Sequence, residues 1–285
     1  MRLFRTHNFD QIQAYEFGWS LLGPPVMTVY CYVFGDVMMD TGQSHMQKEA
    51  LRIASEHHIR RIYLTHYHED HSGNADAIKQ TLNTDIYGHK ITIEKMTTAF
   101  NILPYQKYIW GKATPVNIKP TPEKIETVLG EMIPVHTPGH SKDHTSYLIK
   151  SEGILFSGDL YLGDKIKYFR SDENMGNQIE SLKKILSFDF KVLLCGHSPK
   201  RKDGKKHIQR KLDFLQNLYG NIILLWEKGI PEKQIFSSLN LREAYYAKLI
   251  CFGDVSMLNG VRSAIRHYTS EKKDRLISCR ETEAS

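Results

Sequence analysis

The chain has 285 residues, of which 41% are hydrophobic and 25% are charged, and its net charge is +6. This composition is ordinary for a globular protein, and no apolar run approaches the ~20 residues of a membrane span. The first residues also lack the apolar stretch of a signal peptide, so we expect a cytoplasmic protein with no membrane partner. The mild positive charge weakly favours an anionic small-molecule substrate and does not by itself imply nucleic acid.

The first half of the chain predicts strands with helices between them. A hairpin is expected around Gly35-Asp36, because β-branched and aromatic residues flank this turn signal. Residues 100–125 contain four prolines and predict an irregular excursion over the surface. The expected strands are 28–34, 37–40, 61–65 and 85–88, and the expected helices are 46–57 and 74–82.

The second half becomes helical after His197. A long helical pattern covers residues 205–228, and two or three shorter helices follow to about residue 268. We therefore expect a mixed α/β domain over 1–200, a small helical domain over 201–270 and a flexible tail over 271–285. The strands expected before His197 are 132–135, 145–149, 154–156 and 191–194, with a helix at 174–187.

The aromatic residues of the helical part have spacings typical of helix packing. We expect them to form a core rather than a substrate pocket, and we expect the unit to act as a lid or a dimer surface. The sequence leaves the oligomeric state open, with a dimer among the alternatives. The residues concerned are Trp226, Tyr245, Tyr246 and Phe252.

The four cysteines are scattered and form no CxxC pair. In a chain this long they do not predict a disulfide framework. Cys195 lies inside the apolar run 192–195, which indicates a buried strand residue rather than a metal ligand. The other three are Cys31, Cys251 and Cys279.

The segment Thr65–His71 carries three imidazoles and two carboxylates within seven residues. If His66 and His68 end an extended segment, their period-2 spacing points both rings the same way. Asp70 and His71 then follow across a turn and can face a second ion. A polar helix start does not require so many side chains that can bind metal. The segment therefore indicates a site for a pair of metal ions rather than a structural motif.

Three shorter motifs follow predicted strands, where connecting loops usually carry the chemistry. Each places a glycine directly before a candidate ligand, and glycine lets the backbone approach a crowded centre. One such motif alone is weak, but all of them in this order form a strong signal. The candidate ligands are His140 in His-Thr-Pro-Gly-His, Asp159 in Phe-Ser-Gly-Asp, and His197 in Leu-Cys-Gly-His.

Together these motifs resemble the metallo-β-lactamase-fold hydrolase superfamily, whose signature is HxHxDH followed by single His, Asp and His motifs. The resemblance covers roughly residues 25–200 and implies an α/β fold, an αββα sandwich, to which the helical unit is appended. It also implies that Asp40 supports the ligand histidines by hydrogen bonding. The implied ligands are His66, His68 and His140 for one ion, Asp70, His71 and His197 for the other, and Asp159 bridging both.

This donor set suits two Zn²⁺ ions, although iron or manganese tolerates the same ligands. Two such ions would lower the pKa of a bridging water toward ~7, so that hydroxide attacks a small ester, thioester or phosphodiester. Asp70 would both bind metal and orient the nucleophile. In true β-lactamases of the family Cys or Ser matches Asp159, so lactam hydrolysis is not expected as the main activity. The segment 160–167 departs from glyoxalase II, so that family's substrate residues do not transfer.

Two features keep other activities open. The first is the basic run Lys200–Lys211, with seven basic residues in twelve; curled over the metals, it would suit RNA, as in the family's endoribonuclease branch. The simpler interpretation is a solvated loop and helix start. The second is His144, a proton donor to a leaving group or, more simply, a histidine beginning a strand. A mononuclear-iron oxidoreductase resembling persulfide dioxygenases is a further alternative, disfavoured because all seven ligands are present.

Overall fold

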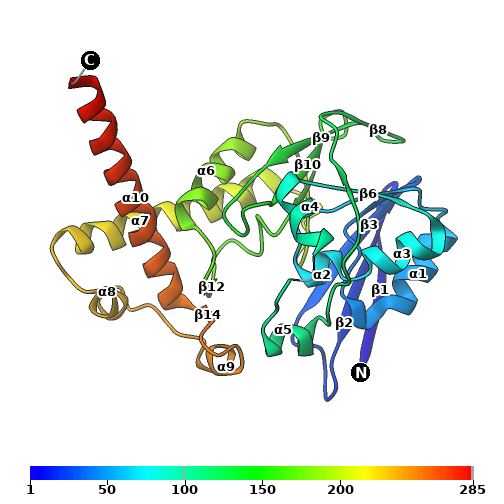
Figure 1. Cartoon of the computed structure of the whole chain (residues 1–285), viewed down its shortest axis with the longest axis horizontal. Coiled ribbons are helices and arrows are strands. Elements are labelled where there is room, and N and C mark those ends of the chain that lie inside the picture. The colour runs from blue at the N-terminus through cyan, green and yellow to red at the C-terminus, as the bar shows by residue number, and fades with distance from the viewer. Residues whose placement is uncertain (99, 284–285) are drawn as a thin grey trace.

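Two mixed sheets pack face to face between layers of helices (Figure 1). The computed structural model describes residues 1–98 and 100–283, without the side chains of 275–283. The first sheet has the order β1-β2-β3-β4-β5-β6-β7, with β1 (Arg2–Phe9), β2 (Ile12–Trp19), β3 (Thr28–Phe34), β4 (Val37–Met39), β5 (Arg61–Tyr63), β6 (Asp85–Gly88) and β7 (Lys119–Pro120). The second has the order β13-β11-β10-β9-β8, with β8 (Ile125–Thr127), β9 (Gly130–His136), β10 (Thr145–Ile149), β11 (Ile154–Gly158) and β13 (Val192–Cys195).

Alternation along the strands separates the core into layers. In β5, Tyr63 points between the sheets, where its ring lies 5.9 Å from that of Tyr147 in β10. Its neighbour Ile62 points the other way and packs under the helices of the first sheet. The helices over the first sheet are α1 (Gln47–Glu56), preceded by the 3₁₀ turn η1 (Ser44–Met46), and α3 (Ala75–Leu82); those over the second are α6 (Met175–Leu186) and α7 (Gly204–Glu227). The layers confirm the predicted α/β, αββα sandwich.

Most expected strands and helices lie within a few residues of their predicted bounds, but several elements were not predicted. The N-terminal hairpin of β1 and β2 adds an edge to the first sheet. The segment expected to be irregular contains a short helix and two short strands. The helices not predicted are α2 (Glu69–Ser72), α4 (Lys90–Thr97) and α5 (Pro104–Ile109).

The C-terminal helices share the core of the second sheet. Ile222 of α7 and Val261 of α10 belong to the same buried cluster as Leu182 and Leu193. A two-stranded ribbon of β12 (Phe169–Arg170) and β14 (Val255–Ser256) also ties this unit to the sandwich. The helices of the unit are α8 (Glu232–Ser238), α9 (Tyr245–Ile250) and α10 (Met257–Glu283). Helix α10 includes much of the predicted tail, whose last two residues lie outside the described part.

The predicted aromatic core of this unit is wrong. Tyr245 and Phe252 are 78% and 77% exposed, Tyr246 is equally exposed, and Trp226 is partly exposed. Helix α9 has only six residues and buries none of them, so it attaches to the rest of the chain through its neighbours Cys251 and Val255. Trp226 lies on α7, Tyr245 and Tyr246 lie on α9 and Phe252 lies beyond it, so these side chains share no helix face.

The described cysteines behave as expected. Cys31, Cys195 and Cys251 are free and buried, and Cys195 lies in β13 as predicted. The side chain of Cys279 lies outside the described part. Among the described helices, none is long and apolar enough to cross a bilayer.

Candidate metal centre

The predicted ligands lie together because they follow strands that end at one edge of the sandwich. Asp159 follows β11 and His197 follows β13, and these parallel strands pair up to Gly158 and Cys195. Their carboxyl ends therefore deliver both side chains to the same place. The segment after β5 supplies the histidine-rich motif from the facing sheet, and the turn between β9 and β10 supplies His140.

Three imidazoles form the first group. His66 Nε2 lies 2.9 Å and His140 Nε2 lies 3.1 Å from Nδ1 of His68. All three side chains are buried, and their nitrogens lie within 4.8 Å of one another. Three imidazole nitrogens that converge on one point form the open, three-ligand face that a divalent cation takes in hydrolases.

The second group combines carboxylates with imidazoles. His197 Nε2 lies 3.4 Å from an oxygen of Asp70, and His71 Nε2 lies 3.6 Å from the same oxygen. Asp159 Oδ1 lies 3.3 Å from His71 Nε2, while Asp159 Oδ2 lies 3.4 Å from both His140 and His197. The Asp159 carboxylate thus reaches both groups, which is the arrangement that a bridging ligand requires.

The buried polar atoms of the site fit a cation. His71 Nε2 and Asp159 Oδ1 are fully covered and have no hydrogen-bond partner within the described residues. Leaving buried polar atoms unsatisfied is costly, so such groups usually mark a bound ion or water. Imidazole and carboxylate donors in this number match Zn²⁺, iron or manganese.

Outer hydrogen bonds fix the orientation of the ligand rings. Asp40, buried in the turn after β4, accepts from His71 Nδ1 at 2.7 Å and from the backbone N–H of Thr65 at 2.7 Å. His140 Nδ1 donates to Glu173 at 2.9 Å, and His197 Nδ1 donates to the carbonyl of Thr28 at 2.6 Å. Because Nδ1 of each of these three rings is held from outside, Nε2 points to the centre. Outer hydrogen bonds commonly orient metal-binding histidines in this way. The sequence indicated Asp40 but neither Glu173 nor Thr28.

The two groups differ in their charge. Burial, and then the neighbouring imidazoles, hold the pKa of His66 well below its ordinary value, so this ring is a neutral donor at pH 7. Burial also opposes protonation of His197, but the carboxylates of Asp159 and Asp70 outweigh it and raise its pKa to about 10. Burial raises the pKa of Asp70, yet His71 and His197 bring it below its ordinary value. The second group is thus a pair of carboxylates balanced by positive charge, which a divalent cation would supply by displacing protons.

His144 has a structural position. Its ring is fully buried, Nδ1 donates to Thr137 Oγ1 at 2.9 Å, and Nε2 accepts from the backbone N–H of Asp159 at 3.0 Å. Both ring nitrogens of His144 are therefore engaged in hydrogen bonds within the protein. The simpler interpretation of His144 fits this geometry: it holds the backbone of Asp159 in place and does not face a leaving group.

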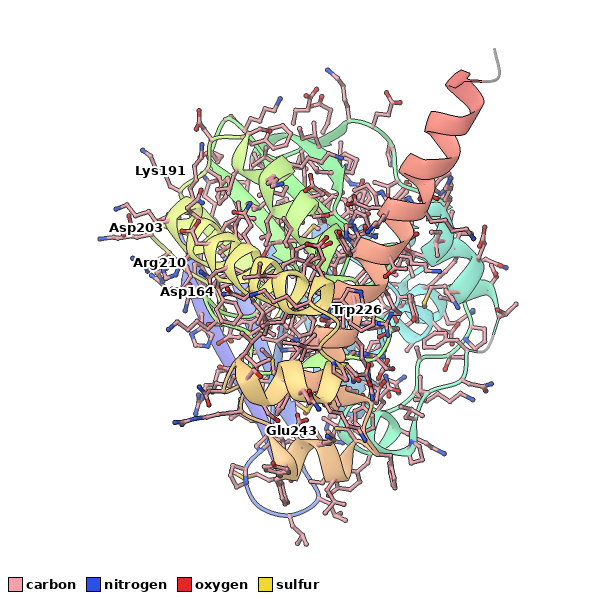
Figure 2. All side chains as sticks on the ribbon, turned by 90° about the vertical axis from the view of Figure 1, so that its left-hand side faces the viewer. Asp164, Lys191, Asp203, Arg210, Trp226 and Glu243 are labelled. Carbon is pink, nitrogen blue, oxygen red and sulfur yellow. The ribbon has the colours of Figure 1, made fainter. Side chains whose placement is uncertain are left out.

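The basic run does not curl over the centre. Lys200 pairs with Leu193, so the chain doubles back along β13 toward its amino end, away from His197. Arg201 donates to the carbonyl of Asn8 near the end of β1, and Lys211 is buried and donates to the carbonyl of Leu160. In Figure 2, Asp203 lies beside Lys191 at the beginning of α7. The basic side chains of this run therefore make separate local contacts and do not form a rim around the metal centre.

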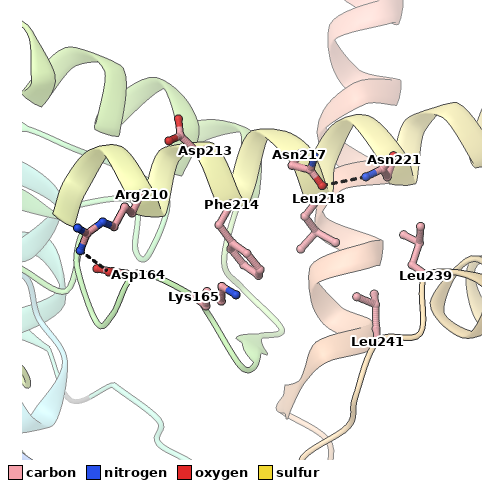
Figure 3. Close-up of a pocket in the computed structure, with 10 residues that line it drawn as sticks. All are labelled: Asp164, Lys165, Arg210, Asp213, Phe214, Asn217, Leu218, Asn221, Leu239 and Leu241. Carbon is pink, nitrogen blue, oxygen red and sulfur yellow. Dashed lines mark hydrogen bonds and ion pairs between the residues drawn. The ribbon is translucent and has the colours of Figure 1, made fainter. Parts of the chain in front are cut away.

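A separate cavity of about 500 Å³ lies between α7, the segment after β11 and the α8–α9 connection (Figure 3). Phe214 and Leu218 contribute apolar walls, and Arg210 lies 3.4 Å from Asp164 at the rim. It shares no lining residue with the two ligand groups. We assign this cavity no part in the chemistry of the centre.

Comparison with known families decides the identity of the fold. The family model described as the metallo-beta-lactamase superfamily matches residues 24–197, the span that contains all seven candidate ligands. The chain belongs to the metallo-beta-lactamase superfamily. Membership implies binding of divalent metal, and the His and Asp groups described above are where this chain can hold it.

Relatives of known sequence include hydrolases. The atrochrysone carboxyl ACP thioesterase of Aspergillus fumigatus is 25% identical over 72% of this chain, and the match spans 60% of that protein. The hydroxyacylglutathione hydrolase of Wigglesworthia glossinidia brevipalpis is 25% identical over 65% of this chain and 63% of its own length. A beta-lactamase-like protein 2 homolog of Caenorhabditis elegans is 23% identical over 81% of this chain and 73% of its own length. The chain thus spans less than two thirds of the first two.

A solved structure supports the fold over nearly the whole chain. A metallo-beta-lactamase family protein of Thermus thermophilus aligns with 90% of this chain and 94% of its own, at a TM-score of 0.64 and 17% identity. At this identity the likeness concerns the fold alone. It includes most of the helical C-terminal part, which the family model does not.

Proposed function

We propose that this protein is a two-metal hydrolase that cleaves a thioester. The observation that carries the proposal is Asp159, whose two oxygens lie 3.3–3.4 Å from His71, His140 and His197 and so reach both ligand groups. A structural metal would need only one closed set of ligands. Two adjoining sets that share a carboxylate suit a reaction in which one ion holds the substrate oxygen and the other the nucleophile.

The proposed residue roles follow the geometry. The first ion would be held by His66, His68 and His140, the second by Asp70, His71 and His197, and both by Asp159. Such ions lower the pKa of a coordinated water toward ~7 and polarise the acyl oxygen.

The remaining chemistry belongs to the chain. Asp70 stays ionised, because His71 and His197 lower its pKa, so it can accept a hydrogen bond from the attacking water and orient it. Asp40 and Glu173 keep the rings of His71 and His140 turned toward the metal centre.

The substrate class rests on three arguments. Two of the relatives are named as a thioesterase and as a hydroxyacylglutathione hydrolase, so a thioester is the first substrate to test. The basic run faces away from the centre, which removes the electropositive rim that favoured RNA. Asp159, where lactamases of the family carry Cys or Ser, argues against a lactam.

Turnover of a small substrate panel tests the proposal. The metal-free protein is reloaded with zinc and assayed with S-butyryl-N-acetylcysteamine, bis(p-nitrophenyl) phosphate and a chromogenic cephalosporin. We expect kcat/KM for the thioester to exceed that for the other two by about a hundredfold or more, and we expect a chelator to abolish it. The Asp189→Asn variant, whose carboxylate is fully exposed, is a control that should turn over like the wild type. Faster cleavage of the phosphodiester would contradict the thioesterase proposal and favour a nuclease.

A further inference from the structure

One end of the molecule carries most of the large apolar side chains that face solvent. Of the fourteen in the described residues, ten lie in the loop 20–27, in residues 103–108 and in residues 245–252. We call the exposed apolar side chains of these three segments the apolar end. Leu22 is 84% exposed, and Tyr245 and Leu249 are 78% exposed. An apolar surface gathered in one place marks an interaction site, whereas single exposed apolar residues are ordinary.

The three segments lie at the same end of the molecule. The loop between β2 and β3, helix α5 and helix α9 occupy the lower end in both Figure 1 and Figure 2. Tyr105 of α5 donates to Asp254 after α9 at 2.6 Å, and Tyr168 contacts Met27 of the loop at 3.9 Å. Trp110, at the end of α5, lies 6.0 Å from the ring of His197. The apolar end therefore borders the metal centre.

Most of the exposed charges around the apolar end are basic. Asp172, which pairs with Arg170 near Asp254, is an acidic exception. On residues 20–27, 103–112, 166–168 and 241–254, every exposed charged side chain is basic: Lys107, Lys112, Lys167 and Arg242. The acidic residues of the same segments are turned inward. Glu243 accepts hydrogen bonds from Lys248, from Ser256 and from the backbone N–H of Met257. Asp254 accepts from Tyr105.

We propose that the apolar end docks onto an anionic lipid surface, with the loop 20–27 and helix α9 entering the interface and the metal centre facing the bilayer. Tyr, Phe and Leu side chains prefer this boundary, and Lys and Arg beside them bind anionic headgroups. The loop carries no charged residue between Ser20 and Met27. The docking does not depend on the proposed thioester chemistry. Docking of this kind requires no spanning segment, and the described helices include none that could cross a bilayer.

The charge pattern argues against a second copy of the chain as the partner. A two-fold interface brings the same surface patch together from both copies, so Lys107, Lys112 and Lys167 would face their own counterparts. An anionic surface is complementary to this pattern, and the net charge of +6 adds to the attraction. The loop 20–27 and helix α9 also project from the molecule as two separate protrusions (Figure 1). A lipid surface can deform around both, whereas a rigid protein surface would have to match their shapes.

Vesicle sedimentation of the full chain tests the proposal. The probes are vesicles of phosphatidylcholine alone and vesicles with about one third phosphatidylglycerol. We expect the wild type to bind the anionic vesicles about tenfold more tightly or better, and we expect this preference to disappear in high salt. The double variant Leu22→Ser with Tyr246→Ser should lose about tenfold or more of that binding. The control Val128→Ser with Leu224→Ser changes side chains that are 64% and 54% exposed elsewhere and should bind like the wild type.

Both double variants should melt like the wild type, because the replaced side chains are exposed. With folding shown to be intact, three other outcomes would overturn the proposal. Wild-type protein that sediments equally with and without vesicles would reject membrane docking. Equal loss in both double variants would reject the assigned surface. A wild-type dimer that the Leu22→Ser, Tyr246→Ser variant dissociates, without vesicle binding, would assign the apolar end to a second copy.

Discussion

Asp159→Ala should lower thioester hydrolysis by about a thousandfold or more, because the oxygens of this carboxylate lie 3.3–3.4 Å from Nε2 atoms of both ligand groups. Its removal leaves His71 and His197 without one of their two shared carboxylates. We therefore expect the variant to bind the second ion much more weakly while keeping the three-histidine group. Steady-state kinetics and metal content measured on the same sample check both effects.

The Asp159→Asn variant separates charge from shape. It keeps the side-chain volume but cannot supply the same negative charge, so it should resemble Asp159→Ala in turnover and melt like the wild type. Asp172→Asn, at a half-exposed carboxylate on the segment before α6, is the matched control and should retain full activity. Near-wild-type turnover of Asp159→Ala would show that the two groups do not share a ligand in the reaction.

Gly196→Ala should impair the centre without adding or removing any metal ligand. A methyl group at this position would lie 2.4 Å from Asp159 Oδ1 and 2.7 Å from Cε1 of His71, so both ligands must shift. A displacement of about 1 Å at a reacting site costs roughly a hundredfold in rate. We expect a loss of that order in kcat/KM, together with weaker metal binding. Assays at saturating and at limiting zinc distinguish the two contributions.

Gly220→Ala in α7 is the control for this substitution. A methyl group there meets nothing within 4 Å, and alanine is the better helix former by about 0.5–1 kcal/mol. The control should therefore melt at the same or a higher temperature with unchanged kinetics. If Gly196→Ala also behaved this way, the close packing of Gly196 against the ligands would have no functional consequence.

The strands of the sandwich were predictable where their side chains alternate or form apolar runs, as in β3, β10 and β13. The hairpin of β1 and β2 was not, because β1 is a polar edge strand and β2 contains a charged residue that the fold buries. Glu16 of β2 is 7% exposed and accepts from His7 and Thr28, partners that only tertiary contact supplies. The prediction that the C-terminal aromatic residues form a core was wrong, because helical spacing does not show which helix faces pack against the rest of the chain.

The candidate ligands could be proposed from the sequence because the motifs that carry them follow predicted strands in the order of the resembled family. The structure brings all seven together in two adjoining groups. The glycines before the ligands also indicated close packing, which the surroundings of Gly158 and Gly196 confirm. Glu173 and the carbonyl of Thr28 were not predictable. They lie 33 and 169 residues from the histidines that they orient, and no local pattern links such pairs.

The metal content of the purified and zinc-reloaded protein tests the central claim most directly. Elemental analysis by mass spectrometry, with the protein concentration from amino-acid analysis, should give two zinc ions per chain. The account predicts that the Asp159→Ala variant prepared in parallel holds fewer. A single ion per chain at saturating zinc, or a single iron that zinc does not replace in active protein, would contradict a two-metal hydrolase.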